Sequence, residues 1–314
     1  MKGLTDVPGI LVGHATDLSG LTGCTVILCG NDAVGGVDIR GSATGSCELE
    51  TLNPGAVAGN VHAIVLAGGS AFGLEASCGV RTWLEKRGVG YPAGPTHVPI
   101  VPSAILFDLG FAKHGVRPTR EMGEKAAMAA NSGSVVEGNV GAGTGATIGK
   151  IFGMKQAMKG GIGSASVTLG SGVIVAALVA LNPLGDVIEN GKIIAGARKS
   201  PNSREFADSA MSMRHGLNQA QGGGNTVLAV IATNARLDRV QTNKLAALGS
   251  LGMVRTISPV NTMADGDITF AISLGGEKAT VDALGVAAAE ALGIAVIRAA
   301  RAARTSGGVP GLAG

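Results

Sequence analysis

The apolar residues of this chain fall largely into short runs bounded by glycine. Runs of this kind that are rich in β-branched residues are typical of strands. They predict strands at residues 9–16, 24–29, 34–39, 63–66, 167–169, 173–181, 226–233 and 268–274. Two of these segments, 173–181 and 226–233, are almost wholly apolar, which indicates strands buried on both faces.

Other apolar residues recur every three or four positions, the spacing of a helix that buries one face. This period predicts helices over 120–131, 240–253 and 279–303, and another that begins with Ser70 as its N-cap and ends at Gly88. Because strands and helices alternate along the chain, the pattern predicts a layered α/β fold.

The pattern is interrupted between residues 200 and 225. This stretch is polar and weakly patterned and ends in three glycines before Asn225, which is typical of a flexible linker. We expect one domain over residues 1–314, in which this linker lies just before the strand at 226–233.

Composition indicates a packed core with an excess of glycine. The chain has 52 Gly and 11 Pro among 314 residues, yet 46% of residues are apolar and 15% are charged, which excludes collagen and disorder. Aromatic residues make up only 3%, so Ala, Val, Ile and Leu must fill the core. The net charge of +3 is spread without a basic stripe, and we expect no nucleic-acid partner.

Targeting signals are also missing from the pattern. The longest apolar run, 173–181, is much shorter than the ~20 residues of a membrane-spanning helix. Acid, proline and glycine interrupt the first nine residues before a signal-peptide core forms. We expect a cytoplasmic protein with no membrane partner, whose four cysteines are reduced and buried.

Several common catalytic motifs are excluded by their spacing. Residues 143–150 resemble a phosphate-binding loop, but Thr144 and Ile151 stand where that motif needs Gly and Ser or Thr. The chain has no G-x-S-x-G elbow and no His pair at metal-ligand spacing. We therefore expect no cofactor and no metal, while a triad built on a histidine remains open because its members need only meet in space.

One segment suits self-cleavage of the chain. Three glycines and Asn225 lead directly into Thr226, the first residue of an apolar strand. Attack by the Thr226 hydroxyl on the Asn225 carbonyl, followed by hydrolysis, would release a new N-terminal threonine. Its α-amine has a pKa near 7.7–8.0 and is a ready base for the adjacent hydroxyl. The alternative is an ordinary glycine turn into a strand, in a non-enzymatic assembly protein.

The chain resembles the DmpA-type family of self-processing N-terminal-nucleophile hydrolases over nearly its whole length. The segments that carry the resemblance are 4–17, 66–74, 143–150, 181–186 and 224–226. The resemblance implies an αββα four-layer sandwich, cleavage into residues 1–225 and 226–314 that stay together, and a homo-oligomer, expected to be a tetramer of processed units.

The resemblance also implies roles for individual residues. Thr226 is the nucleophile and Asn225 is the last residue of the larger subunit. Asn182 matches an asparagine whose amide stabilises the oxyanion, and Lys150 matches a lysine near the nucleophile in the nylon-oligomer hydrolase branch. Without the resemblance, Asn182 would be the first residue of an Asn-Pro turn and Lys150 a solvated lysine.

Two carboxylates point to the same branch. Asp265 and Asp267 stand at i and i+2 before a strand, so they face one side of an extended backbone. In relatives with a serine nucleophile, the resemblance places a Ser-x-Glu at the corresponding positions. The alternative for Asp265 and Asp267 is an ordinary Asp-Gly turn on the surface. The chain departs from some relatives at Phe107, which has no hydroxyl where they place a tyrosine near the substrate.

The expected function is an autoprocessing amide hydrolase. Its substrate would be a small linear amide or short peptide, such as a 6-aminohexanoate oligomer. The resemblance leaves two enzymatic alternatives: an aminopeptidase for D- or β-amino acid peptides, and an acyltransferase related to ornithine acetyltransferase.

Overall fold

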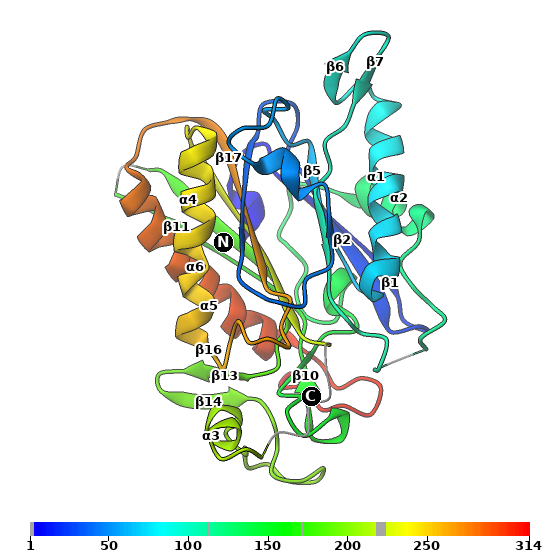
Figure 1. Cartoon of the computed structure of the whole chain (residues 1–314), viewed down its shortest axis with the longest axis vertical. Coiled ribbons are helices and arrows are strands. Elements are labelled where there is room, and N and C mark those ends of the chain that lie inside the picture. The colour runs from blue at the N-terminus through cyan, green and yellow to red at the C-terminus, as the bar shows by residue number, and fades with distance from the viewer. Residues whose placement is uncertain (1–2, 112, 171, 218–223) are drawn as a thin grey trace.

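Two five-stranded sheets lie face to face in the computed structural model, which describes residues 3–111, 113–170, 172–217 and 224–314 (Figure 1). The first sheet has the strand order β1-β2-β5-β8-β4. Its strands are β1 (Leu11–Asp17), β2 (Thr22–Leu28), β5 (Ala63–Ala67), β8 (Ser103–Ile105) and β4 (Ser46–Cys47). Helices α1 (Glu75–Glu85) and α2 (Arg120–Ala129) cover its outer face.

The second sheet has the order β11-β12-β15-β17-β3 and contains the most apolar strands. Its strands are β11 (Ile162–Thr168), β12 (Ile174–Asn182), β15 (Thr226–Ala235), β17 (Ile268–Glu277) and β3 (Val34–Ile39). All neighbours in this sheet are antiparallel except β15 and β17, which are parallel. Helices α4 (Arg239–Gly249), α5 (Leu251–Thr256) and α6 (Val281–Ala302) lie on its outer face.

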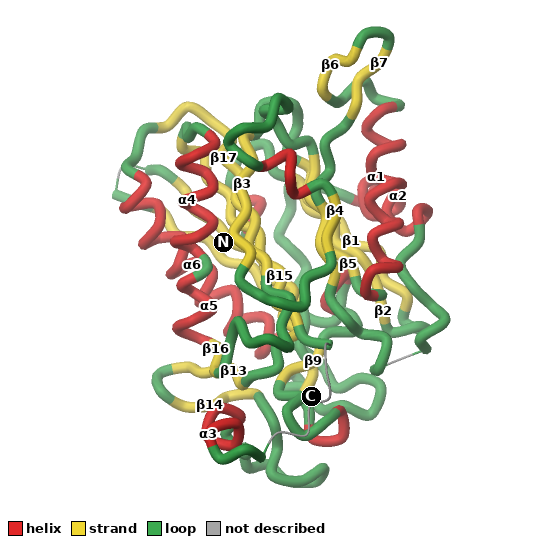
Figure 2. Tube along the Cα trace, in the orientation of Figure 1, coloured by secondary structure: helices red, strands yellow, loops and turns green. Residues whose placement is uncertain are grey.

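Shorter elements surround the sheets, as Figure 2 shows. The short strands are β6 (Tyr91–Ala93), β7 (Thr96–Val98), β9 (Thr147–Ile148), β10 (Met158–Lys159), β13 (Asp186–Glu189), β14 (Lys192–Ala195) and β16 (Ile257–Ser258). The short helices are α3 (Ser209–Arg214) and the 3-10 turns Leu4–Asp6, Leu49–Leu52, Ser70–Leu74, Gly141–Gly143 and Met154–Gln156.

Three apolar clusters separate the four layers. The cluster between the sheets is aliphatic apart from Cys29 and Phe270, and two further clusters lie beneath the helices on either side. The predicted αββα sandwich and its aliphatic core are therefore confirmed. Among the described residues only α6 is long and apolar enough to cross a membrane, and it packs along β11 and β12 as a core helix.

The predicted helix from Ser70 to Gly88 is divided in two. Residues Ser70–Leu74 form a 3-10 turn, and the α-helix begins at Glu75. Ser70 is not its N-cap: it lies inside the turn with a φ of 54°, and the N-cap positions are Gly69 for the turn and Leu74 for the helix.

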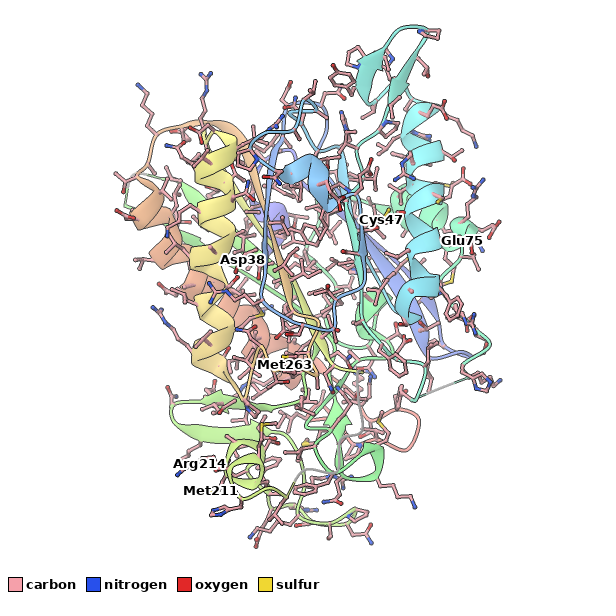
Figure 3. The ribbon with its side chains drawn as sticks, in the orientation of Figure 1. Asp38, Cys47, Glu75, Met211, Arg214 and Met263 are labelled. Carbon is pink, nitrogen blue, oxygen red and sulfur yellow. The ribbon has the colours of Figure 1, made fainter. Side chains whose placement is uncertain are left out.

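The predicted helix over 240–253 is also divided, at Ser250 between α4 and α5. The hydroxyl oxygen of Ser250 lies 2.6 Å from the carboxylate of Asp38 and 2.9 Å from the carbonyl of Ala246, so its single proton is donated to one or shared between them. Asp38 extends from β3 toward α4, as labelled in Figure 3. This bond to the sheet fixes the junction between the two helices.

Three other predictions need correction. The strand expected at 167–169 begins at Ile162, because Gly163 and Ser164 pack against α6 and β12 although they break the apolar pattern. Helix α3 lies within the segment expected to be a linker, of which residues 218–223 fall outside the described part of the chain. Cys47 is exposed on the edge strand β4 (Figure 3) and Cys78 is half-buried, whereas Cys24 and Cys29 are buried as expected.

Candidate functional site

The expected catalytic residues meet where three strands of the second sheet have their ends. Strand β12 ends at Asn182, which lies opposite Thr226, the first residue of β15. Because β15 and β17 are parallel, the start of β17 lies beside the start of β15, and Asp265 and Asp267 directly precede it. Figure 3 labels Met263, an exposed residue of the loop that leads to these carboxylates, at this lower end of the sheet.

Thr226 lies against the peptide bond that precedes it. Its side chain is buried, and its hydroxyl oxygen is 2.5 Å from the carbonyl oxygen of Asn225. The same carbonyl accepts the backbone N–H of Gly266 at 2.9 Å. Position 266 requires glycine, because a Cβ there would lie 2.9 Å from the Thr226 hydroxyl oxygen and 2.6 Å from the carbonyl oxygen of Ala43.

The amide of Asn182 has a defined orientation. Its oxygen accepts the backbone N–H of Thr147 at 2.9 Å and the ammonium of Lys150 at 3.1 Å. The amide nitrogen therefore points the other way, where it donates to the carbonyls of Phe107 at 3.3 Å and Gly224 at 3.2 Å. Asn182 thus presents a neutral, fully buried donor beside the chain segment that leads to Thr226.

Lys150 follows β9 and has a partly buried side chain. Its ammonium lies within 3.1 Å of the carbonyl oxygens of Thr147, Asn182 and Pro183, in addition to the Asn182 side chain. Burial lowers the pKa of Lys150 to about 7, while the charge of Asp265 acts in the opposite direction. The surrounding oxygens favour the ammonium form, and with a pKa of about 7 Lys150 is partly protonated near neutral pH.

The two carboxylates are buried rather than placed on a surface turn. Asp265 accepts the backbone N–H of Leu184 at 3.1 Å and the hydroxyl of Thr262 at 2.5 Å. Asp267 accepts the N–H of Val227 at 2.7 Å, next to the nucleophile. The carboxylates therefore connect the start of β17 to its neighbour β15 and to the segment that follows β12.

Asp267 combines burial with a like charge nearby. Burial and the charge of Asp265 raise the pKa of Asp267 well above its usual value, against the N–H donors of Val227 and Asn261 and the charge of Lys150. A carboxyl group with a raised pKa can exchange a proton near neutral pH, which is the range that general acid-base catalysis needs.

Phe107 follows β8 of the first sheet and is 37% exposed. Besides accepting the Asn182 amide through its carbonyl, it places its ring against Gly224, where a Cβ would lie 3.4 Å from a ring carbon. The first sheet therefore contributes an aromatic surface next to the Asn225–Thr226 peptide bond.

The structure brings all seven expected residues together. They are Phe107, Lys150, Asn182, Asn225, Thr226, Asp265 and Asp267. The sequence did not point to the N–H groups of Gly266 and Thr147, since a backbone donor has no signature in residue types. Within the described residues, no group of three or more His, Cys, Asp or Glu side chains is arranged to bind a metal.

Comparison with known sequences identifies relatives that span almost the whole chain. The sequence profile of peptidase family S58 matches residues 2–313. An uncharacterised aminopeptidase of Mycobacterium leprae (strain TN) is 36% identical over 99% of this chain and 93% of its own length. A 6-aminohexanoate-oligomer endohydrolase of Kocuria sp. (strain KY2) is 33% identical over 94% of this chain and 85% of its own length.

Solved structures share the fold. A β-aminopeptidase of Burkholderia sp. superposes with a TM-score of 0.69 at 26% identity, covering 99% of this chain and 90% of that one. The L-aminopeptidase D-Ala-esterase/amidase of Ochrobactrum anthropi, described as a variant of the Ntn-hydrolase fold, superposes with a TM-score of 0.76 at 22% identity over 98% of this chain and 88% of its own. The resemblance first seen in short motifs is thereby confirmed.

Proposed function

Since this chain belongs to peptidase family S58 and is a hydrolase that acts on amide bonds, we propose that Thr226 is its nucleophile and becomes N-terminal when the chain cleaves itself after Asn225. The observation that carries this proposal is the contact between the Thr226 hydroxyl and the Asn225 carbonyl, which also accepts the N–H of Gly266. The alternative of a non-enzymatic assembly protein is wrong, because the family model that matches the chain is that of a peptidase family.

Self-cleavage would proceed in three steps. The Thr226 oxygen attacks the carbonyl carbon of Asn225 while Asp267 takes the hydroxyl proton, and the N–H of Gly266 stabilises the oxyanion. The peptide C–N bond then breaks, and the Thr226 nitrogen takes the proton back from Asp267. Water hydrolyses the resulting ester, which leaves a carboxyl group on Asn225 and a free amine and hydroxyl on Thr226.

Substrate hydrolysis would use the new amine as its base. The amine takes the hydroxyl proton as the Thr226 oxygen attacks the substrate carbonyl, and this proton leaves with the amine product. Once Gly224 has moved away, the amide nitrogen of Asn182 is available to the oxyanion. The ammonium of Lys150 contacts the oxygen of the same amide, so it polarises the Asn182 N–H bonds and strengthens the donor. Water then hydrolyses the acyl-enzyme.

The processed parts are proposed to stay together. Strand β12 of the larger part pairs with β15 of the smaller part from Val175–Thr233 to Asn182–Thr226. Separation would expose both apolar strands and the core around them. Following the resemblance, we further propose a cytoplasmic homo-tetramer of processed chains.

Small linear amides, including 6-aminohexanoate oligomers, are the proposed substrates. The Kocuria relative supports this class, and the threonine nucleophile with two aspartates supports the same branch. The second candidate is a D- or β-amino acid aminopeptidase: the mycobacterial relative supports an aminopeptidase, and the Burkholderia structure supports action on β-amino acid peptides.

A substrate panel tests the proposal. The purified protein is assayed on 6-aminohexanoate oligomers, β-alanyl amides and D-alanyl amides, beside the variants Thr226→Ala and Thr226→Ser. We expect hydrolysis to fall by about 10³-fold or more in Thr226→Ala and to survive in part in Thr226→Ser, which keeps a hydroxyl. Equal activity of Thr226→Ala and the unmodified chain would contradict the proposal, and acetyl transfer to an amine that outpaces hydrolysis would favour the acyltransferase instead.

A further inference from the structure

A second lysine is buried behind the site. Lys159, on β10, has almost no exposed surface and is among the largest fully buried side chains of the described residues. Its ammonium donates to the carbonyls of Thr144 at 3.0 Å and Ala146 at 2.5 Å, and it lies 4.7 Å from the centre of the Phe111 ring. Lys159 thereby fixes the backbone that leads into β9.

A buried carboxylate lies on the other side of the same region. Asp108 follows Phe107 in the loop after β8 and is 4% exposed. It accepts the hydroxyl of Thr22 at 2.6 Å and the N–H of Gly69 at 2.7 Å. A Cβ at Gly145 would lie 2.4 Å from its oxygen, so the backbone approaches it closely. Asp108 thereby attaches the loop to the ends of β2 and β5.

The two buried charges stabilise each other. Burial lowers the pKa of Lys159 to about 7, and the charge of Asp108 counteracts this effect. Burial raises the pKa of Asp108, and its hydrogen bonds and the charge of Lys159 oppose the rise. Each group also keeps hydrogen-bond partners of its own, which are backbone carbonyls for Lys159 and the Thr22 hydroxyl and Gly69 N–H for Asp108.

Each member of this pair is adjacent in sequence to a group that holds the Asn182 amide. Ala146, which accepts from Lys159, precedes Thr147, whose N–H donates to the Asn182 oxygen. Asp108 directly follows Phe107, whose carbonyl accepts the Asn182 nitrogen. The opposite ends of one amide are thus held by two backbone segments, one fixed by a buried ammonium and the other by a buried carboxylate.

We infer that Lys159 and Asp108 are positioning residues that orient the amide of Asn182 for the reaction. The inference rests on the proposed function, in which Asn182 stabilises the oxyanion. Neither residue touches Thr226 in any hydrogen bond of the described residues, so both act through the backbone and through Asn182. Lys159 has one additional effect, because its charge lowers the pKa of Lys150, which contacts the same amide oxygen.

The test compares four variants with the unmodified full chain on whichever amide the substrate panel identifies. Lys159→Met removes the charge at similar size, and Asp108→Ala removes the carboxylate. Asp108→Asn keeps groups able to bond Thr22 and Gly69 but removes the charge. Lys192→Met changes an exposed lysine on β14 and is the matched control.

We expect kcat to fall by about 10- to 100-fold in Lys159→Met and Asp108→Ala with little change in KM, since a small displacement of a transition-state donor costs rate rather than binding. Asp108→Asn should recover much of the loss, and Lys192→Met should match the unmodified chain. The pH profile of kcat should change in Lys159→Met and not in Lys192→Met, because the charge of Lys159 acts on the pKa of Lys150.

The outcomes separate this inference from the proposed function. Folded Lys159→Met and Asp108→Ala proteins with unchanged kcat and pH profile, beside an active unmodified chain, would overturn the positioning role alone. An unmodified chain whose hydrolysis does not depend on Thr226 would overturn the proposed function itself. If Lys159→Met does not fold, the ratio of kcat between Asp108→Asn and Asp108→Ala decides, and a ratio near one overturns the inference.

Discussion

The two halves of the sandwich have the same architecture but bury different kinds of residues. Each half is a five-stranded sheet with helices on its outer face, and both contribute to one apolar cluster between the sheets. The second sheet ends in buried polar side chains on three neighbouring strands, Asn182, Thr226 and Asp267. The first sheet contributes only the loop that carries Phe107 and Asp108. The candidate catalytic side chains are therefore concentrated where three interior strands of the second sheet have their ends, and the other half of the sandwich mainly supports them.

Glycine shows the same contrast. In the first half, Gly79 and Gly123 let α1 and α2 approach closely: a Cβ on either would lie 1.9 Å from a backbone oxygen of the other helix. In the second half, Gly266 leaves room for the Thr226 hydroxyl. Glycines thus allow helices to pack closely in both halves, as Gly163 does against α6, whereas Gly266 serves the site in the second half.

The largest effect on activity is expected from a change at the strand ends of the second sheet that form the site. Asn182→Ala removes the side-chain donor that faces the proposed oxyanion, and kcat should fall by about 10²–10³-fold. The measurement is steady-state kinetics on the processed protein. An unchanged kcat would remove Asn182 from the transition state and would weaken the contrast between the sheets.

Gly266→Ala should affect self-cleavage more than stability. The added methyl group would displace the Thr226 hydroxyl or the Ala43 carbonyl, and with them the N–H that donates to Asn225. We expect processing to slow by about 100-fold, because a misplacement of about 1 Å is enough for such a loss. Time-resolved intact mass follows the reaction, and processing at the normal rate would contradict the role of this N–H.

Gly123→Ala, in the first half, should affect stability more than activity. Its methyl group meets the Ala76 carbonyl, so α1 and α2 must move apart at a cost of about 1–3 kcal/mol of unfolding free energy. Denaturant unfolding measures this loss, and kcat per folded molecule should stay the same. A large fall in kcat without loss of stability would show that the first half takes part in the chemistry.

The smallest effect concerns pH. Because the pKa of Asp267 is raised in the folded state, the folded chain keeps a proton that the unfolded chain loses as pH rises from about 4 toward neutrality. The unfolding free energy of the unmodified chain should therefore decline over this range relative to that of Asp267→Asn. Denaturant unfolding of both proteins at several pH values checks the sign, and parallel pH curves would contradict it.

The sequence was most informative where apolar runs are continuous. The strands expected at 173–181, 226–233 and 268–274 match β12, β15 and β17 at their starts to within one residue. Strands of two to four residues, such as β9 and β10, could not be predicted because so few positions show no period. The division at Ser250 was missed because its hydrogen bond to Asp38 joins residues far apart in the chain, and the change from turn to helix at Leu74 leaves no mark in the apolar spacing.

The residues of the site were predicted from sequence motifs, but their burial and shifted pKa values were not. Asp265 and Asp267 stand in a dipeptide context typical of exposed turns, and only the packing of three strand ends shows that they are buried. Lys159 and Asp108 gave no signal, because a single lysine or aspartate in a sequence usually indicates a solvated side chain. Their roles depend on contacts between residues far apart in the chain.

The central claim is that Thr226 attacks the peptide bond before it, and intact mass combined with N-terminal sequencing tests it most directly. After incubation of the purified chain, the account predicts two fragments, residues 1–225 and 226–314, with Thr226 at the new N-terminus, and an uncleaved chain for Thr226→Ala under the same conditions. An unmodified chain that stays at 314 residues, or a Thr226→Ala chain that is cleaved at the same bond, would contradict it.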